Sequence, residues 1–289
     1  MIRARSISLN LALGLLAGTA GCTAAPWGAA PAAGPAAPVD GPAVPRPGVD
    51  RAALQDLLRR EAERLPGRVS LHVRVDDGSS EGVSAGVNAE RAMPAASVAK
   101  LPLMIAVESA WEAGKLPRAE ADLRRLRAAI TVSDNAAADA LIDRLGMRTL
   151  AALLPQHGFR VTRLERRFGE LARGKDNPGS ARELTAALLR IARGEAVSPA
   201  ASREMRELLL AQTRRARIPA GLPKGVTCGN KTGTWGGAVN DVAFVEPSGA
   251  PRYALAVFLA DAGPRPRAEK TIAKLSAAVH RFVTRRAER

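Results

Sequence analysis

The chain has 289 residues, with 43 Lys and Arg against 28 Asp and Glu, and its formal net charge is +15. An apolar fraction of 46% excludes wholesale disorder, and two cysteines exclude a disulfide-dense scaffold or a four-cysteine zinc site. The excess of basic residues alone leaves a nucleic-acid or membrane-surface partner open.

The first residues of the chain have the pattern of an export signal. Two arginines precede an apolar run over residues 7–20, which is too short to span a bilayer comfortably. The run ends in Gly18-Thr19-Ala20-Gly21-Cys22, which resembles a bacterial lipobox except that Thr19 stands where an aliphatic residue is usual. We therefore expect residues 1–21 to be a lipoprotein signal peptide and Cys22 to be lipidated. An ordinary cleaved signal with an incidental cysteine is the alternative.

A segment dominated by Ala, Pro and Gly follows, over residues 22–48. It predicts an extended tether, because such a composition cannot bury a core. Behind a lipidated cysteine, a tether would hold a folded domain off a membrane. Removal of residues 1–21 takes away two arginines and no acid, so the basic excess belongs to the folded part, residues 49–289.

Beyond the tether the hydrophobic pattern predicts a helix, a strand, several helices, strands and a helix. Apolar residues at helical spacing predict a helix near residues 51–64, and alternation over residues 69–76 predicts a strand with one buried face. Residues 97–215 are rich in Ala, Leu and Arg and predict several helices. Ser180 and Glu183 form an S-x-x-E pattern, which predicts a capping box at the start of one of them.

Near the end of the chain the apolar residues again recur at every second position, as in a strand. Residues 239–246 and 252–260 predict two strands joined by a turn at 247–250, and apolar residues from Ile272 to Phe282 predict a C-terminal helix. The simplest packing of this order is an α+β fold. In it, an antiparallel sheet is flanked by the terminal helices and carries an inserted all-α subdomain.

Three short motifs follow one another along the chain: Ser97-Val98-Ala99-Lys100, Ser133-Asp134-Asn135 and Lys231-Thr232-Gly233. Residues 101–107 are almost wholly apolar, so Lys100 is expected at the start of a buried helix. The i,i+3 spacing puts the serine hydroxyl beside the lysine amine. A serine needs an adjacent base, and a lysine whose pKa is lowered by burial can act as one. The pair therefore indicates a nucleophile with its base.

The other two motifs suit the walls of a cleft. Ser133-Asp134-Asn135 lies between helical segments, where hydroxyl and amide groups can project into a cleft. Lys231-Thr232-Gly233-Thr234 comes just before the residues whose alternating pattern predicts strands, so it should begin or border a strand. A glycine there lets another backbone approach closely, and edge amide groups can pair with a peptide-like substrate. Asn240-Asp241 either lines this strand or turns the chain.

The order S-x-x-K, S-D-N, K-T-G resembles the class A β-lactamases and penicillin-binding proteins, the penicillin-recognising enzyme family. The resemblance runs from about residue 51 to the C-terminus and extends to residues 130–135 and 218–223. It implies a five-stranded antiparallel sheet. The α/β part would lie at about 49–96 and 225–289, and the helical part at about 97–224.

The resemblance also implies a role for each motif residue. Ser97 would be the acylated nucleophile and Lys100 its general base. Ser133 would pass a proton to the leaving nitrogen, and Lys231 would hold Ser133. The backbone N–H groups of Ser97 and Thr234 would form the oxyanion hole. The other implied substrate-binding residues are Asn135, Thr232 and Gly233, whereas Asp134 is expected to be structural.

Two departures from the family bear on turnover. In class A β-lactamases an Ω-loop glutamate activates the deacylating water, and in the matching register this chain has Phe168, which cannot activate water. Glu165 or Glu170 could take that place only in another register. In addition, Ser97 and Ser133 are separated by only 36 positions, fewer than is usual, so we expect a more open cleft.

The acylation residues are thus complete in this sequence, whereas the deacylation residue is not. The sequence predicts a β-lactamase-like serine hydrolase that forms an acyl-enzyme on Ser97 with β-lactam amides or related peptidoglycan peptides. Two alternatives stay open. One is a penicillin-binding D-alanyl peptidase-like protein that deacylates slowly, and the other is a non-catalytic envelope lipoprotein that kept the fold.

We expect no cofactor, metal or nucleic acid. The three histidines lack metal-ligand spacing, and Cys228, with no histidine near it in the sequence, is expected to be a buried strand residue. The arginines are spread over several helices and the nine aromatic residues form no stacking platform. We expect a monomer that is exported to the cell envelope and anchored at the membrane through Cys22.

Overall fold

The computed structural model describes residues 49–79, 82–173 and 176–285. The predicted signal peptide, the predicted tether and Cys22 lie outside these residues and stay predictions. Among the described helices, none is long and apolar enough to cross a membrane.

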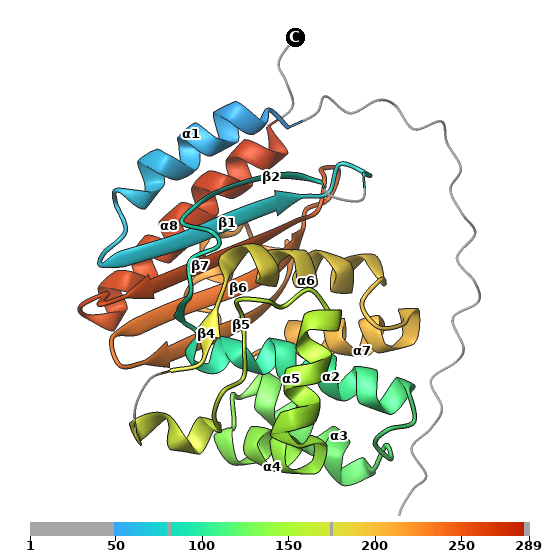
Figure 1. Ribbon diagram of the computed structural model, residues 1–289. Helices are drawn as coiled ribbons and strands as arrows, with labels where there is room; N and C mark the ends of the chain where they lie inside the picture. The colour runs from blue at the N-terminus through green and yellow to red at the C-terminus, as the bar shows by residue number, and fades with distance from the viewer. Residues whose placement is uncertain (1–48, 80–81, 174–175, 286–289) are drawn as a thin grey trace, which may run out of the picture. The chain divides into compact units, whose positions relative to one another are not determined.

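Five antiparallel strands form the sheet at the centre of the described part (Figure 1). They are β1 (Arg68–Val75), β2 (Val83–Val87), β5 (Thr227–Trp235), β6 (Ala238–Glu246) and β7 (Tyr253–Ala260). Their spatial order is β2-β1-β7-β6-β5, so the last strand of the chain lies in the middle and β5 forms an edge. The predicted α+β fold class is confirmed, and the two predicted C-terminal strands match β6 and β7 to within one residue.

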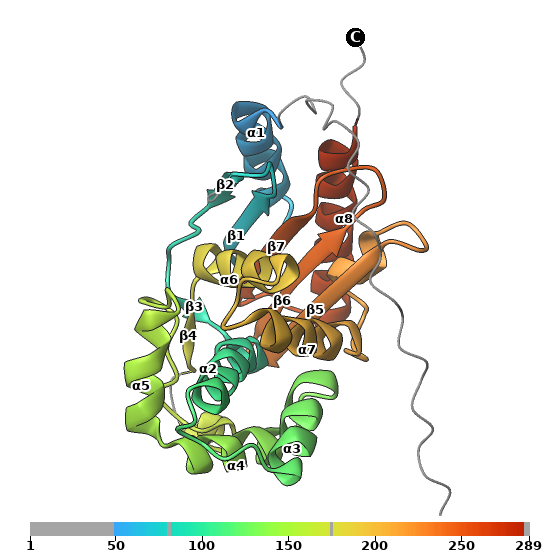
Figure 2. The same cartoon turned by 90° about the vertical axis from the view of Figure 1, so that its right-hand side faces the viewer.

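Both faces of the sheet are covered, because alternate residues of its central strand enter two different cores. Every residue of β7 is buried. Its odd-numbered residues from Tyr253 to Leu259 pack with the terminal helices α1 (Arg51–Ala62) and α8 (Arg265–Thr284). Its even-numbered residues pack with the helical region. Figures 1 and 2 show α1 and α8 on one face of the sheet and the other helices across from them.

The helical region is built around one buried helix, α2 (Lys100–Glu112), in which eleven of thirteen residues are buried. This burial matches the apolar run predicted after Lys100, and α2 contacts four helices around it. A further helix, α6 (Ala181–Arg193), lies directly on the sheet against β1, β6 and β7. The helices around α2 are α3 (Glu120–Thr131), α4 (Asn135–Leu145), α5 (Met147–Gln156) and α7 (Pro199–Leu210).

Short elements connect the two layers. Strands β3 (Met93–Pro94) and β4 (Pro178–Gly179) form a small antiparallel sheet beside the first motif. Three short helices complete the described part. They are η1 (Ala96–Ala99), η2 (Phe168–Arg173) and η3 (Ile218–Gly221).

The start of α6 corrects the predicted capping box. Ser180 Oγ does accept a hydrogen bond from the N–H of Glu183, as predicted. The Glu183 carboxylate does not return to the N–H of Ser180, which instead donates to Thr162 Oγ1. The Glu183 carboxylate instead accepts three hydrogen bonds from the backbone N–H groups of residues 160–162. Three hydrogen bonds to a distant segment stabilise the carboxylate more than the single hydrogen bond of a capping box would. Glu183 thereby fixes the segment that leads toward η2.

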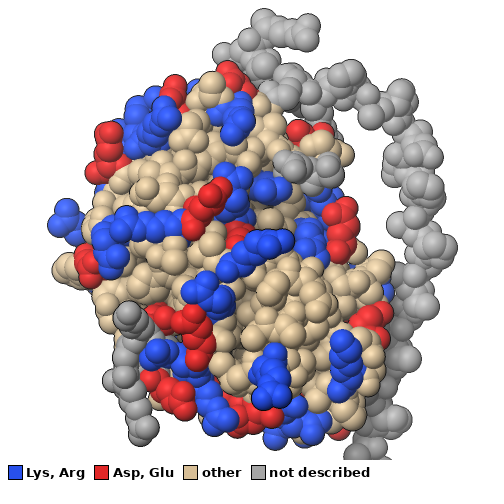
Figure 3. All heavy atoms as spheres, viewed as in Figure 1, with Lys and Arg blue, Asp and Glu red and all other residues tan. Residues whose placement is uncertain are grey.

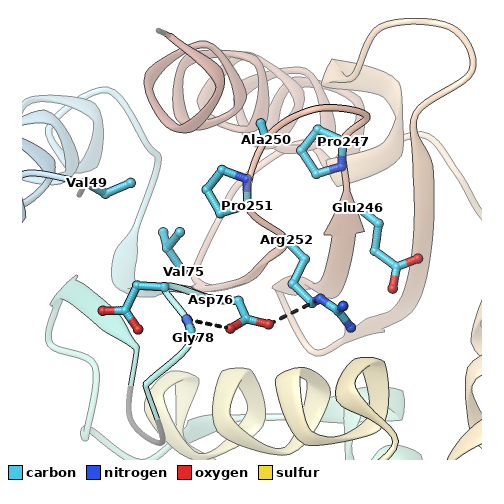
Figure 4. A pocket seen from close by; sticks show the side chains of 10 residues that line it. Val49, Val75, Asp76, Gly78, Glu246, Pro247, Ala250, Pro251 and Arg252 are labelled. Atoms are coloured by element: carbon cyan, nitrogen blue, oxygen red, sulfur yellow. Dashed lines mark hydrogen bonds and ion pairs between the residues drawn. The ribbon is translucent and has the colours of Figure 1, made fainter. Parts of the chain in front are cut away.

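A cavity of about 640 Å³ lies where the end of β1 meets the turn between β6 and β7 (Figure 4). Asp76 lies at its floor, where its carboxylate pairs with Arg252 at 3.2 Å and accepts a hydrogen bond from the N–H of Gly78. Arg193, at the end of α6, binds the same carboxylate at 2.6 Å. The Asp76 carboxylate therefore connects the end of β1 with the end of α6 and the start of β7. No residue of the three motifs lines this cavity.

Candidate active site

Ser97 lies in η1, the helical turn that runs directly into α2. Lys100, the first residue of α2, is completely buried. Its Nζ lies 3.0 Å from Ser97 Oγ, 3.1 Å from the carbonyl oxygen of Ser133 and 2.6 Å from Asn135 Oδ1. The first two motifs thus meet at one amine, and the i,i+3 spacing places Ser97 Oγ and Lys100 Nζ within hydrogen-bond distance.

The turn that presents Ser97 is held from two sides. Ala96 has a positive φ of 47°, a conformation that costs a residue other than glycine about 1 kcal/mol or more. Asp176 accepts the N–H of Ala96 at 2.6 Å, and Asn240 Nδ2 donates to the carbonyl oxygens of Pro94 and Ala95. Asn240 is a buried residue inside β6, so it supports the turn and does not turn the chain.

Ser133 joins the third motif to the second. It lies before α4 with a positive φ of 68°, and Lys231 Nζ donates to its Oγ at 3.0 Å. Asp134 is the N-cap of α4 and accepts a hydrogen bond from the N–H of Ala137 at 2.8 Å. This contact gives Asp134 the structural position that the sequence indicates.

The third motif lies in the middle of the edge strand β5, not at its start. Lys231 is completely buried, and its Nζ also donates to the carbonyl oxygen of Thr232 at 3.0 Å. A Cβ on Gly233 would lie 2.5 Å from the carbonyl oxygen of Ala95, so only glycine lets β5 approach η1 this closely. Thr234 follows and is exposed.

Arg217 is a residue of this site that the sequence reasoning missed. It is 2% exposed, and its guanidinium donates to Thr234 Oγ1 at 2.5 Å and to the carbonyl oxygens of Gly233 and Asn240. Glu269 on α8 accepts from the same guanidinium. The only signal in the sequence is its position directly before the segment 218–223, where the family resemblance continues.

Burial lowers the pKa values of both motif lysines. The pKa of Lys100 is lowered to about 8 by burial, although the negative charges of Asp139 and Asp134 oppose the shift. Burial lowers the pKa of Lys231 well below its ordinary value, and the nearby charge of Lys100 lowers it further. Arg214, on the loop before β5, disfavours the protonated form of both amines. Lys100 can therefore be neutral near physiological pH, which a proton acceptor requires.

Phe168 covers the other side of Lys100. Its side chain is 2% exposed, and Lys100 Nζ lies 4.4 Å from the centroid of its ring. The N–H groups of Phe168 and Gly169 donate to the two carboxylate oxygens of Asp139 on α4, at 2.6 and 2.8 Å. These bonds fix the start of η2, so the ring and not a carboxylate faces the amine.

The two glutamates near Phe168 do not replace it. Glu165 is exposed and pairs with Arg163 at 2.8 Å. Glu170 is also exposed. The backbone before Phe168 is fixed as well, because Asn177 Oδ1 accepts from the N–H groups of Glu165 and Arg166. In this register both carboxylates lie in solvent.

Other reactive side chains of the described residues lie outside this cluster. Cys228 is a buried residue of β5, and burial raises the pKa of its thiol to about 12, which keeps it protonated and unreactive. Within residues 49–79, 82–173 and 176–285, no group of three or more His, Cys, Asp or Glu side chains could hold a metal ion.

A sequence model of the beta-lactamase enzyme family matches residues 51–121 and 122–283, which is most of the described chain. The chain belongs to this family. The carbapenem-hydrolysing β-lactamase KPC of Klebsiella oxytoca is 35% identical over 141 residues, 45% of this chain and 47% of that protein. The chain spans about half the length of the curated β-lactamases that it matches.

Solved structures of the β-lactamase fold match over more of the chain. A variant of PBP-A, solved as an acyl-enzyme complex with penicillin G, has a TM-score of 0.72 and 25% identity, covering 81% of this chain and 98% of that one. An ancestral class A β-lactamase has a TM-score of 0.70 and 28% identity, covering 78% of this chain and 98% of that one. Both kinds of relative, β-lactamase and penicillin-binding protein, therefore share this fold.

Proposed function

We propose that this protein is a β-lactamase-like serine hydrolase that reacts through an acyl-enzyme on Ser97. The observation that carries the proposal is the contact of 3.0 Å between Lys100 Nζ and Ser97 Oγ, at a buried amine with a pKa of about 8. A neutral amine at this place can take the hydroxyl proton as Oγ attacks a carbonyl carbon. The substrate would be a β-lactam amide or a related peptidoglycan peptide.

In this proposal one lysine moves the protons of acylation and the other orients a serine. A bond forms between Ser97 Oγ and the carbonyl carbon, while the hydroxyl proton passes to Lys100 Nζ. The C–N bond then breaks, and Ser133 Oγ gives its proton to the leaving nitrogen. Lys231 Nζ donates a hydrogen bond to Ser133 Oγ at 3.0 Å and holds it in place. The proton that Lys100 took then restores Ser133, so both lysines end the step as they began it.

Substrate binding would use the edge of β5 and the start of α4. The backbone N–H groups of Ser97 and Thr234 would stabilise the oxyanion, a contribution of roughly 3 kcal/mol for one such donor. Asn135 would bind the substrate amide. Lys231 and Arg217 would attract a substrate carboxylate, with Thr232, Gly233 and Thr234 forming the strand edge beside it.

Phe168 favours slow deacylation as a second candidate behaviour. In the register of the family resemblance, Phe168 stands where a class A β-lactamase has its water-activating glutamate, and its ring lies over Lys100. Without that base the acyl-enzyme would persist, as it does in penicillin-binding proteins. The second candidate function is therefore a penicillin-binding D-alanyl peptidase-like protein with the same acylation chemistry.

Localisation is part of the proposal and rests on the sequence alone. We propose that residues 1–21 direct export and that Cys22 carries a lipid anchor, so that a monomeric domain works at the cell envelope. The basic surface of the folded part suits an anionic envelope. Metabolic labelling with a fatty-acid analogue tests this point, and the Cys22→Ser variant should lose the label.

Intact-protein mass spectrometry after mixing with benzylpenicillin tests the chemistry. A mass increase equal to the whole penicillin on Ser97, located by peptide mapping, is the expected result. The Ser97→Ala variant should show no adduct. Ser248→Ala is a matched control, because this exposed serine lies in the turn between β6 and β7 and outside the site.

A chromogenic cephalosporin assay on the same samples separates the candidates. Steady turnover that is lost in Ser97→Ala identifies a β-lactamase. An adduct that outlives the assay, with little turnover, identifies a penicillin-binding protein. If neither adduct nor turnover is found with any β-lactam, the proposal is wrong and the non-catalytic envelope lipoprotein replaces it.

A further inference from the structure

The outward face of α8 carries a row of basic residues that the proposed reaction does not use. They recur at intervals of three, four, seven and four residues, which places them on one side of a helix. All are exposed. At 1.5 Å per residue the row is about 27 Å long. This α8 stripe consists of Arg267, Lys270, Lys274 and Arg281 on the helix and of Arg285, the C-cap residue that directly follows it.

No carboxylate of α8 itself lies on the α8 stripe. The acidic residue of α8 is Glu269, whose carboxylate turns to the opposite side and accepts hydrogen bonds from Arg217 and Arg265. The buried residues of α8, such as Ile272 and Val279, also lie opposite the stripe. Within the part of the chain that the structure describes, the stripe cations form no ion pair.

Basic side chains elsewhere lie close to acidic ones. On the face seen in Figure 3, basic and acidic side chains lie next to one another. Several exposed arginines of the described residues form ion pairs, for example Arg182 with Glu90. Other exposed arginines without an ion pair among the described residues, such as Arg127, Arg148 and Arg203, lie singly on α3, α5 and α7. The α8 stripe is therefore a continuous row of positive charge on a single element.

We propose that the α8 stripe is the surface by which this domain docks on an anionic lipid bilayer. A straight row of five cations matches a flat sheet of lipid headgroups, and juxtamembrane cations are attracted to such a surface within a Debye length. The residues between the two halves of the stripe, Ala277 and Ala278, are small, so no side chain prevents close approach. With no large apolar residue among them, binding is electrostatic and does not require insertion.

The position of α8 makes docking compatible with the reaction. α8 lies on the sheet face opposite the helical region that carries Ser97 and Ser133, so a bilayer at α8 would lie on the other side of the sheet from these two serines (Figure 2). The described domain begins at α1, and α1 packs against α8 along a groove of about 440 Å³. Arg60, Arg281 and Arg285 line this groove together with the carboxylates of Asp56 and Glu61 on the α1 side. A chain anchored through its N-terminal segment would thus enter the domain on the docked side.

Vesicle co-sedimentation of the full chain tests this inference. We would compare vesicles of phosphatidylcholine with vesicles in which about a third of the lipid is phosphatidylglycerol, at low salt and at about 0.15 M salt. The stripe variant is Lys270→Gln, Lys274→Gln and Arg281→Gln together. The control variant is Arg127→Gln, Arg148→Gln and Arg203→Gln, which removes the same charge from other helices. Every protein carries the same N-terminus, so any anchor contributes equally.

We expect the stripe variant to lose at least about 20-fold in partitioning onto the anionic vesicles, since each cation near such a surface contributes about fivefold. The control variant should stay within about threefold of the native chain, and the difference between the two variants should be larger at low salt than at about 0.15 M salt. An equal loss in both triple variants would reduce the effect to net charge and overturn the inference. Stripe-dependent binding to soluble polyphosphate without binding to the vesicles would also overturn it.

Discussion

Lys100 is the residue whose protonation should set the pH dependence of acylation. Burial holds its pKa at about 8, and the base form is the one that can accept the Ser97 proton. The acylation rate with benzylpenicillin should therefore rise about tenfold per pH unit below pH 8 and level off above it. Stopped-flow or quench-flow measurements of adduct formation check this, and a flat rate between pH 6 and about 8 would contradict the assignment of Lys100 as the base.

Arg214 offers a way to shift that profile without touching the contact between Ser97 and Lys100. Its positive charge disfavours protonation of Lys100 and Lys231, and its guanidinium approaches the carbonyl oxygen of Val132, next to Ser133. The Arg214→Gln variant should move the midpoint of the acylation profile to higher pH. Arg215→Gln is the matched control, because the neighbouring arginine donates to the carbonyl oxygen of Cys228 instead. A midpoint that stays in place in Arg214→Gln would contradict this reasoning.

Phe168 should determine the lifetime of the acyl-enzyme. A carboxylate at this buried position would lie beside Lys100 and could activate a water molecule, which a positioned base accelerates by about 100-fold or more. We expect Phe168→Glu to shorten the half-life of the penicillin adduct at least about tenfold. It should also raise the pKa of Lys100, because an opposite charge favours the protonated amine.

Phe168→Gln separates base catalysis from simple opening of the site. Glutamine has nearly the shape of glutamate but cannot take a proton, so its adduct should remain long-lived. Equal shortening in the Gln and Glu variants would show that the phenyl ring acts by excluding water, not by occupying the place of a base.

Among the elements, the end of β1 depends on one carboxylate. Although burial opposes it, hydrogen bonds from Arg193 and from the backbone N–H of Gly78 hold the pKa of Asp76 below its usual value. Asp76→Ala would leave Arg193 and Arg252 without this partner at the ends of α6 and β7 (Figure 4). We expect a loss of about 2 kcal/mol in the free energy of unfolding, measured by urea denaturation.

Asp77→Ala is the matched control for Asp76. Asp77 is exposed, and its carboxylate binds only to Ser79 among the described residues. Its replacement should change stability by less than about 0.5 kcal/mol. Acylation of Ser97 should be unchanged in both variants, because the cavity around Asp76 contains no motif residue.

Regular alternation made some elements predictable and left others unpredictable. β6 and β7 have long runs of buried residues and were located to within one residue. β2 has a single buried residue, Ala85, so its sequence shows no clear alternation of apolar and polar residues. It is held by tertiary bonds, since the side chain of Gln55 on α1 binds both backbone groups of Gly86. A pattern search along the chain does not detect such a partner.

The same distinction applies to the site. The neighbours Ser97 and Lys100 follow from local spacing, whereas the contact between Ser133 and Lys231 joins residues 98 positions apart and was implied only by resemblance. Arg217 and Asn240 were not identified as supports, and each of them donates to two backbone carbonyl oxygens that are distant in the sequence. Every residue has a carbonyl oxygen, so the sequence carries no mark of which one is bound.

At the scale of the whole molecule, positive charge is arranged in two ways. Around the three motifs, burial lowers the pKa values of Lys100, Lys231 and Arg217. The nearby charges of Lys100, Arg214 and Arg217 lower the pKa of Lys231 further. On α8, by contrast, the cations of the stripe are exposed. The first arrangement serves chemistry on a carboxylate-bearing substrate, and the second serves contact with an anionic surface.

Two buried groups should give the stability of the whole domain opposing dependences on pH. Burial, with the charges of Glu204 and Glu112, raises the pKa of Glu108 on α2 to about 7 against the opposing charge of Arg118. Its neutral form is favoured by the fold. The stabilisation is therefore fully present below pH 4.5, the ordinary value, and is lost as the pH rises to about 7.

His72 makes the free energy of unfolding depend on pH in the opposite direction. Burial, with the charges of Arg182 and Arg74, lowers the pKa of this histidine on β1 from 6.5 to about 3. Its contribution is therefore present above pH 6.5 and is lost as the pH falls to about 3. Between pH 4.5 and 6.5 the unfolded chain holds the His72 proton and the folded chain holds the Glu108 proton, so these two contributions cancel.

The Glu108→Gln variant should show the pH dependence of stability that comes from His72, which Glu108 cancels in the native chain. Glutamine stays neutral, so the variant should match the native protein near pH 4.5 and exceed its free energy of unfolding by about 3 kcal/mol at pH 8. Relative to the native chain, its stability should rise by about 1.4 kcal/mol per pH unit between pH 4.5 and about 7 and level off above that. Urea unfolding at several pH values measures both curves. Glu207→Gln, an exposed glutamate on α7, should give a curve parallel to the native one, whereas a parallel curve for Glu108→Gln would show that Glu108 is already charged in the folded state.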